Sequence, residues 1–255
     1  MKVNFVPKGR LGNAIFRYLA STIICLYSDG IYCVCENQKY NFDDKEFMKY
    51  IDGYKNITDS INMVGFYQHD DIYKNNKTRI LDYMRINKEH YILTDGVFAG
   101  DRNLQKFYIN DLINTPSTFS KRYETVLHIR LEDYVTNNMV LPIERLYILF
   151  NEKCITKHVC IVSSPLRTYF EKNYINKLMN FFKTKGITYN FETNDILTDF
   201  YIMKESKTLI CSRSSISWCA AFLSNRIEKC YFSISCKENS KTVTYKCPID
   251  NTEYY

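Results

Sequence analysis

The chain has 255 residues, of which 45% are hydrophobic and 15% aromatic, and it carries a net charge of +6. This length is enough for one large domain or two small ones with buried cores. The charge is spread along the chain without a dense basic block, which argues against a nucleic-acid-binding surface. No run of about 20 apolar residues occurs and no signal sequence is recognised. We therefore expect no transmembrane segment and a protein that is cytoplasmic or peripheral to a membrane.

The N-terminal part of the chain begins as a βαβ unit. Hydrophobic periodicity predicts a strand at 3–6, a glycine-containing turn at 8–13, a helix at 14–28, a strand at 31–35 and helices at 43–50 and 74–87. Pro116 and its small polar neighbours break the periodicity at residues 114–118. We therefore place a domain boundary there, with domains at 1–118 and 119–255.

The C-terminal part alternates strands and helices. Strands are predicted at 125–129, 158–163, 187–191, 208–211 and 229–234, and helices at 143–151, 166–185, 197–205 and 217–223. Gly186 is predicted to cap the second of these helices at its C-terminus. The tail at 237–255 has no clear period. This alternation predicts an α/β fold, with a parallel sheet flanked by helices.

The ten cysteines show no metal-binding or disulfide pattern. Cys25 lies in an apolar helix-like run, and Cys160 and Cys211 lie in strand-like runs, which favours buried free thiols. No cysteine or histidine pair has the spacing of a structural zinc site. No Asp-x-Asp pair occurs either, which argues against a sugar transferase that holds its nucleotide through a divalent metal.

Polar residues with binding chemistry follow the apolar run that ends at Ile129. His128, Arg130, Glu132 and Asp133 lie within six residues. In open α/β sheets, ligands contact the loops beyond the carboxyl ends of the strands. Arginine grips phosphate oxygens well because it stays charged and presents a planar fork of donors. The run predicts a site for a phosphorylated ligand, and the alternative is an ordinary solvated turn.

Two further loops precede predicted helices. Gly9-Arg10-Leu11-Gly12-Asn13 allows close backbone approach to an anion, or is merely a tight turn. The serine-rich run 212–218 directs hydroxyls and helix N–H groups to one point, which fits a phosphate. Its alternative is plain N-capping by Ser214 or Ser215.

Four segments, in order, resemble the α-1,2-fucosyltransferase family (glycosyltransferase family 11) and, more distantly, the α-1,6- and protein O-fucosyltransferases. GRLGNAIFRY at 9–18 resembles the family's GLGNQMFQY, and GFYQ at 65–68 resembles its GY(F/W)Q. HIRLEDY at 128–134, with Leu-Pro at 141–142, resembles its HxRRGDY signature and the Leu-Pro beyond it. Asp199-Phe200 through SSISW at 214–218 resembles its DF…S(S/T)FSWW block. The similarity runs from the first strand to about Leu223.

This chain departs from the family pattern at four positions. Leu131 replaces the family's second arginine and Glu132 its glycine, while Ala14 replaces a glutamine and Cys219 a tryptophan. Losing one guanidinium removes up to two charge-assisted hydrogen bonds, each worth roughly 1.5–3 kcal/mol. Three consequences of this loss are open: weaker donor binding, a different donor sugar, and lost activity.

The resemblance implies a GT-B-like enzyme with two Rossmann-type domains. It would transfer fucose from GDP-fucose to a glycan hydroxyl, with inversion and without a metal or other cofactor. Arg130 would clamp the phosphates and His128 would contact the nucleotide, while Asp199 would support ribose or base. Ser214, Ser215 and Ser217 would complete the donor site as a cradle at the helix start. Arg10, Gly12 and Asn13 would face the sugar from the N-terminal half.

The base that activates the acceptor hydroxyl is not fixed by these motifs. Asp133 and Glu132 are the carboxylates nearest Arg130 in the sequence. Asp133 could instead hold Arg130 in place through an ion pair. Two other functions are open: a glycosyltransferase that uses another nucleotide sugar, and a non-catalytic glycan-binding relative.

Overall fold

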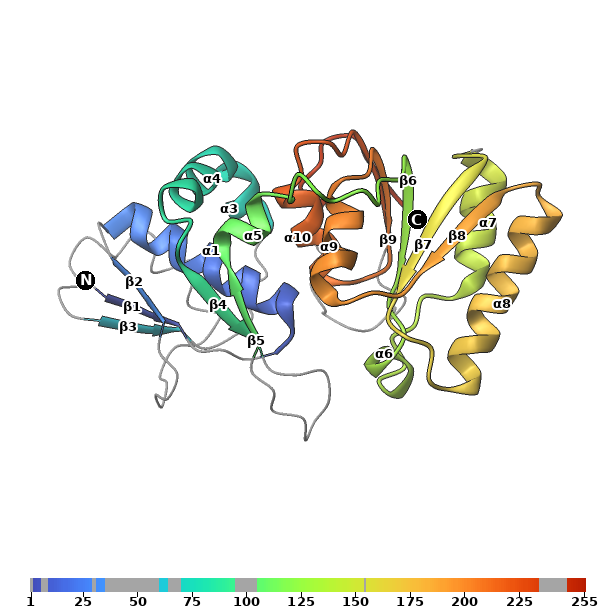
Figure 1. Ribbon diagram of the computed structural model, residues 1–255, viewed down its shortest axis with the longest axis horizontal. Coiled ribbons are helices and arrows are strands. Elements are labelled where there is room, and N and C mark those ends of the chain that lie inside the picture. The colour runs from blue at the N-terminus through green and yellow to red at the C-terminus, as the bar shows by residue number, and fades with distance from the viewer. Residues whose placement is uncertain are drawn as a thin grey trace. The chain divides into compact units, whose positions relative to one another are not determined.

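The computed structural model describes residues 2–5, 9–28, 31–34, 60–63, 70–94, 105–153, 155–233 and 247–255 (Figure 1). The chain divides into two compact units, Met1–Ser117 (unit 1) and Thr118–Tyr255 (unit 2). Each unit has its own parallel sheet. Within the described residues, no helix is both long and apolar enough to cross a membrane.

Unit 1 opens with the predicted βαβ arrangement. Strand β1 (Lys2–Phe5) pairs in parallel with β2 (Ile31–Val34) and with β3 (Ser60–Met63), in the order β2-β1-β3. Helix α1 (Leu11–Ser28) connects β1 to β2. It begins three residues before the predicted start at 14, because Gly12 and Asn13 belong to its first turn rather than to the preceding loop.

The rest of unit 1 consists of short elements: α3 (Asp70–Asn75), α4 (Lys77–Ile86), β4 (Tyr91–Thr94), β5 (Gln105–Tyr108) and α5 (Ile109–Ile113). The helix predicted at 74–87 is divided at Asn76, whose side-chain amide donates to the Ile72 carbonyl at 2.9 Å. Strands β4 and β5 pair antiparallel and were not predicted. The helix predicted at 43–50 lies outside the described residues.

Unit 2 contains a six-stranded sheet in which every pair of neighbours is parallel. Its strands are β6 (Thr125–Ile129), β7 (His158–Ser163), β8 (Thr188–Glu192), β9 (Thr208–Cys211), β10 (Lys229–Phe232) and β11 (Thr252–Tyr254). The order is β11-β10-β9-β6-β7-β8. Counted within the unit and read from the β8 edge, this is 3-2-1-4-5-6, the order of a Rossmann-type doubly wound sheet. The predicted α/β class is confirmed.

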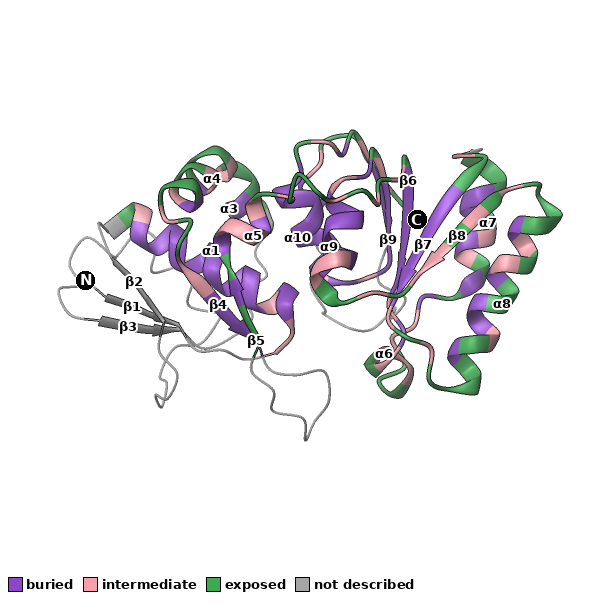
Figure 2. Ribbon diagram, viewed as in Figure 1, coloured by how far each residue is buried: buried purple, intermediate pink, exposed green. Residues whose placement is uncertain are grey.

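Helices cover both faces of this sheet. Helices α7 (Ile143–Lys153) and α8 (Tyr169–Thr184) pack on one face, and α9 (Ile196–Lys204) and α10 (Ser215–Leu223) on the other (Figure 1). All residues of β6 are buried (Figure 2). A strand covered on both faces reads as a continuous apolar run, which is why β6 and β7 were predicted at their observed bounds.

Helix α8 is defined at both ends by local sequence signals. Thr168 and Glu171 form a capping box at its start. At its end, Gly186 has φ 67°, and the N–H groups of Gly186 and Ile187 donate to the Lys183 and Phe182 carbonyls at 3.1 and 2.9 Å. This is a Schellman motif, and it confirms the predicted glycine cap.

The C-terminal tail forms a strand that the sequence did not predict. Strand β11 pairs in parallel with β10 and is mainly polar. Glu253 within it forms ion pairs with Lys229 at 2.6 Å and Lys153 at 2.8 Å. Strand β11 is therefore held to the sheet by strand pairing and ion pairs rather than by a run of buried apolar side chains.

Six cysteines of the described part of the chain are buried free thiols: Cys25, Cys160, Cys211, Cys219, Cys230 and Cys247. The prediction of buried thiols is confirmed for Cys25, Cys160 and Cys211.

Candidate functional site

The two polar motifs of unit 2 meet where the strand order reverses. Strand β6 ends at Ile129 and its neighbour β9 ends at Cys211. The Ser212 N–H donates to the His128 carbonyl at 3.0 Å, and the Arg130 N–H donates to the Ser212 hydroxyl at 3.1 Å. This is the topological switch point, where Rossmann-type sheets open a crevice for ligands. The fold therefore brings the loops that follow β6 and β9 to the position where ligands of such sheets bind.

Arg130 is held in a fixed orientation by Asp133. Its Nε donates to Oδ1 at 3.0 Å and its Nη2 to Oδ2 at 3.1 Å, so the ion pair is bidentate. The Arg130 side chain is 14% exposed and that of Asp133 47% exposed. The sequence left two roles open for Asp133, a general base or an ion-pair partner of Arg130. The structure shows the ion pair. No described residue hydrogen-bonds to Nη1, which leaves one amino group of the fork for an anion.

Tyr134 joins the two loops and received no role from the sequence. The Arg130 Cζ lies 5.1 Å from the centroid of the Tyr134 ring. The Tyr134 hydroxyl donates to the backbone carbonyl of Arg213, the residue before the N-cap of α10. The guanidinium therefore rests on a ring that is anchored to the β9–α10 loop, and the interaction with the ring adds about 0.5–1 kcal/mol. The sequence signal that could have indicated this role is that Tyr134 is the last residue of the HIRLEDY motif.

The backbone of the β6–α6 loop bends at Glu132, just before the short helix α6 (Asp133–Thr136). Glu132 has φ 37° and ψ −115°, in the region that favours glycine. The family that this motif resembles has glycine there. The bend is therefore kept without glycine, at a cost of about 1–3 kcal/mol that the surrounding contacts must offset.

Leu131 points into the core rather than toward the site. It is 1% exposed and belongs to the hydrophobic cluster with Ile129, Leu141 and Ile143. The family's second arginine is thus replaced by a side chain that packs under helices α7 and α8. No second guanidinium comes from this loop position.

The start of α10 lacks the side-chain cap that the sequence allowed. Ser214 is the N-cap residue with φ −141°, yet its hydroxyl makes no capping hydrogen bond. The hydroxyl is buried and has no hydrogen-bond partner among the described residues. A buried unpaired hydroxyl is costly, and uncapped N–H groups at a helix start favour anions. Ser215, the first residue of α10, lies at the same mouth and is partly exposed.

His128 and Ser217 face each other inside unit 2. The His128 Nδ1 lies 2.6 Å from the Ser217 hydroxyl, and the two residues are 7% and 0% exposed. The Ser217 hydroxyl is therefore occupied within the interface of α10 with β6 and β9, and it orients the His128 ring rather than lining the mouth.

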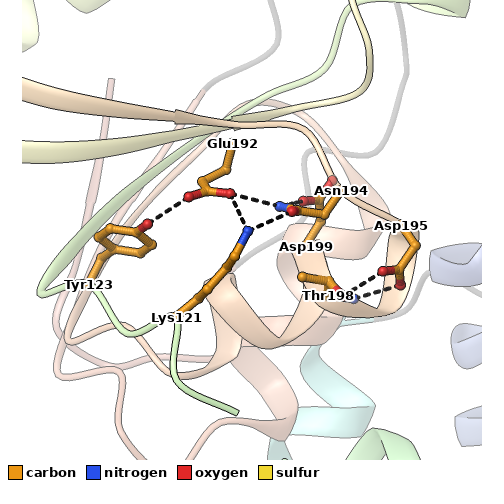
Figure 3. Close-up of polar contacts among 7 residues, drawn as sticks. All are labelled: Lys121, Tyr123, Glu192, Asn194, Asp195, Thr198 and Asp199. Atoms are coloured by element: carbon orange, nitrogen blue, oxygen red, sulfur yellow. Dashed lines mark hydrogen bonds and ion pairs between the residues drawn. The ribbon is translucent and has the colours of Figure 1, made fainter.

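Asp199 belongs to a separate polar cluster on the α9 side (Figure 3). It is 7% exposed in the first turn of α9, and the Asn194 side-chain amide donates to its Oδ1 at 3.0 Å. Lys121 and the Tyr123 hydroxyl each bind Glu192 at 2.7 Å. Among the described residues, the hydrogen bonds of this cluster do not extend to Arg130. Burial raises the pKa of Asp199 to about 7.

The wild-type protein is expected to lose stability as pH rises, because the buried carboxyl of Asp199 must then give up its proton. Asp199→Asn has no such proton and should not show this loss. The pKa of Asp199 is about 7 in the folded protein against an ordinary 3.8, so the folded state holds this proton more tightly. Its contribution to stability is complete below pH 4 and is lost as pH rises through 7. The stability of Asp199→Asn relative to wild type should therefore rise by a few kcal/mol from pH 4 to 8.

This prediction is checked by urea unfolding at a series of pH values, followed through the fluorescence of Trp218. Trp218 is the chain's single tryptophan and is buried in unit 2. Asp195, the N-cap of α9, is the matched control because burial, which would raise its pKa, is outweighed by hydrogen bonds that lower it. Asp195→Asn should change stability with the opposite pH dependence. Parallel pH profiles for Asp199→Asn and wild type would contradict the prediction.

The predicted residues of unit 1 lie together at the start of α1. Gly9 has φ 83°, and a Cβ added there would lie 3.1 Å from the Asn13 Nδ2. The Ala14 N–H donates to the Arg10 carbonyl at 3.0 Å, which closes the first turn over Gly12 and Asn13. The GFYQ segment at 65–68 lies outside the described residues. Arg10, Gly12 and Asn13 thus form one local group within unit 1.

No cluster of three or more His, Cys, Asp or Glu side chains in the described ranges could hold a metal ion. No family model and no curated protein matches the chain. Among solved structures, the E. coli heptosyltransferase WaaC with ADP-2-deoxy-2-fluoro heptose matches with a TM-score of 0.42 and 10% identity. The match covers 100% of this chain and 93% of that one. Similarity at this level assigns neither a family nor a substrate to the chain.

Proposed function

We propose that this protein is a GT-B-like glycosyltransferase whose unit 2 binds a nucleotide sugar through its diphosphate. One observation carries the proposal: Arg130 and the start of α10 meet at the switch point of a Rossmann-type sheet. Ligands of such sheets bind at this point. Arginine and an uncapped helix start are both groups that bind phosphate.

The chemistry of sugar transfer requires such a site. When the bond between sugar and diphosphate breaks, negative charge develops on the outer phosphate, and fixed donors must meet it. Arg130 is already oriented by Asp133 and Tyr134, so little ordering is needed when the ligand arrives. The Nη1 group, the Ser214 hydroxyl and the first N–H groups of α10 would contact the diphosphate, with His128 beside the nucleotide.

The finer proposal is inverting, metal-independent transfer of fucose from GDP-fucose to a glycan hydroxyl. It is supported by the four ordered segments, of which the first, third and fourth include described residues. Asp199 would contact ribose or base, and Arg10, Gly12 and Asn13 would face the sugar. Both Asp133 oxygens are bound by Arg130, so a base role for Asp133 would require the ion pair to open.

A thermal-shift screen across nucleotides and nucleotide sugars tests the proposal. GDP and GDP-fucose should stabilise the protein by about 2.7 kcal/mol at a concentration one hundred times the dissociation constant. GDP should then be released from GDP-fucose when a suitable acceptor glycan is present. If no nucleotide stabilised the protein while glycans did, the non-catalytic glycan-binding function would replace this one.

A different donor is the second candidate, and the placement of Leu131 favours it. Because Leu131 lies in the core, the site has one guanidinium fewer than the family motif provides. In the same screen, stabilisation by UDP or ADP but not by GDP would select this candidate and exclude GDP-fucose.

A further inference from the structure

The segment with which unit 2 begins lies against that unit through alternate side chains. Phe119, Lys121 and Tyr123 are partly buried, whereas the residues between them are exposed. The Phe119 ring meets the buried ring of Tyr201 in α9 edge to face, with their centroids 5.4 Å apart. One side of the segment is therefore docked on unit 2 before β6 starts, and this side carries Lys121.

Glu192, the last residue of β8, is the acceptor that this segment shares with the β8–α9 loop (Figure 3). Its Oε2 accepts the Lys121 ammonium at 2.7 Å and the Asn194 side-chain amide at 3.2 Å, and its Oε1 accepts the Tyr123 hydroxyl at 2.7 Å. Burial by itself would raise the pKa of Glu192, but the hydrogen bonds from these three side chains lower it overall. An ionised Glu192 therefore holds Lys121 beside Asn194.

Lys121 determines which end of the Asn194 amide faces Asp199. The Lys121 Nζ donates to the Asn194 Oδ1 at 2.8 Å. An ammonium has three donors and no acceptor, so only the oxygen of the amide can face it. The Nδ2 group is then left for the two carboxyl groups, and it donates to the Asp199 Oδ1 at 3.0 Å (Figure 3). Every polar atom of the Asn194 side chain is thus engaged in one orientation.

Asp199 receives this donor at a buried position in the first turn of α9, where it is 7% exposed. Burial raises the pKa of Asp199, and the negative charges of Asp195 and Glu192 raise it further, while hydrogen bonds from Asn194 lower it. Asn194 is therefore the group that opposes both burial and the neighbouring carboxylates. Without it, the ionised form of Asp199 would be less favourable.

We propose that Lys121 and Asn194 are positioning residues for Asp199: Lys121 fixes the Asn194 amide with its N–H groups toward Asp199, and the amide holds the carboxyl in the orientation that meets the nucleoside of the ligand. The inference rests on the proposed function for the nature of that ligand, a nucleoside diphosphate. Neither positioning residue would touch the ligand. Lys121 acts through Asn194, and Asn194 acts through Asp199.

Lys121→Met and Arg122→Met remove the same charge from neighbouring positions of one segment. Lys121 contacts Asn194, whereas Arg122 is exposed and its side chain contacts none of the cluster in the described part of the chain. Lys121→Arg keeps a cation that only donates, and Asn194→Ala removes the amide itself. The Lys121 side chain is 42% exposed, so its loss should leave the unfolding midpoint nearly unchanged.

The readouts are the titration of the Asp199 carboxyl, followed by NMR, and the dissociation constant for GDP at pH 8. For Lys121→Met and Asn194→Ala we expect the pKa of Asp199 to rise by about one pH unit or more and GDP to bind at least about tenfold more weakly, as for a lost hydrogen bond to a charged group. Arg122→Met should change neither readout, and Lys121→Arg should restore most of the wild-type behaviour.

A double-mutant cycle separates positioning from the charge of Lys121 alone. In the Asn194→Ala background, Lys121→Met should add little to either change, because the group through which Lys121 acts is already missing. Fully additive changes would show that Lys121 acts on Asp199 by charge, and they would overturn the proposal. An unchanged Asp199 titration in Lys121→Met, or an equal shift in Arg122→Met, would also overturn it.

The Asp199 titration needs no ligand, so it decides the positioning of Asp199 even if the proposed function is wrong. Failure of the wild-type protein to bind any nucleotide would contradict the proposed function alone. A shifted Asp199 titration with unaltered GDP binding would overturn the part of the inference that directs Asp199 to the nucleoside.

Discussion

Arg130→Ala is expected to lower the rate of donor turnover by at least about a hundredfold, which corresponds to about 2.7 kcal/mol of transition-state stabilisation. The substitution removes the cation at the switch point that would meet charge developing on the leaving phosphate. Turnover is measured as GDP release from GDP-fucose, or from the donor that the screen selects. Arg130→Lys keeps the charge but loses the fork, so its rate should lie between those of wild type and alanine.

The loss of activity should not reflect unfolding. Asp133 is 47% exposed and remains hydrated without its partner, and partly exposed ion pairs contribute about 0–1 kcal/mol to stability. Trp218 fluorescence should therefore report a nearly unchanged unfolding midpoint. Arg122→Ala is the matched control, because Arg122 is an exposed arginine of the same unit. Full activity of Arg130→Ala would remove Arg130 from the mechanism.

Leu131→Arg is expected to destabilise unit 2 by about 3–5 kcal/mol, although it restores the residue that the family motif has at this position. The Leu131 side chain is 1% exposed and packs in the core with Ile129, Leu141 and Ile143. An arginine there would bring an unpaired charge into apolar surroundings. The measurement is urea unfolding followed by Trp218 fluorescence.

Two substitutions show that burial, rather than loss of leucine or addition of charge, causes this effect. Leu131→Met conserves volume and should cost less than about 1.5 kcal/mol. Ile148→Arg introduces the same charge at a residue of α7 that is 54% exposed, and surface changes usually stay within about 0.5 kcal/mol. A stable Leu131→Arg protein with tighter donor binding would mean that residue 131 faces the site after all.

Local signals in the sequence predicted most elements of unit 2. β6 and β7 are continuous apolar runs bounded by polar residues, so their limits were predicted at the observed residues. Gly186 marked the end of α8 because its positive φ suits glycine. β4, β5 and β11 were missed, and β5 and β11 are mostly exposed or partly buried, so neither carries the apolar run that marked β6 and β7.

The candidate site was predictable only in part. The rule that ligands meet the carboxyl ends of parallel strands selected Arg130 and Ser214 from the sequence. The Arg130–Asp133 ion pair was one of two stated alternatives, and the structure shows it. Tyr134 was not selected, because its role arises from a contact with a backbone group of another loop. Backbone donors and acceptors look the same at every position of a sequence.

The sequence by itself predicted the α/β class, which the structure confirms, together with a boundary near Pro116 and residue types suited to binding phosphate, because these follow from periodicity, turn chemistry and side-chain charge. Only the tertiary structure decided that β6 lies beside β9, since strand pairing joins residues that are far apart in the chain. It also decided that Leu131 packs in the core against helix α8, while the Arg130 N–H meets the Ser212 hydroxyl, because these contacts join segments that are far apart in the chain.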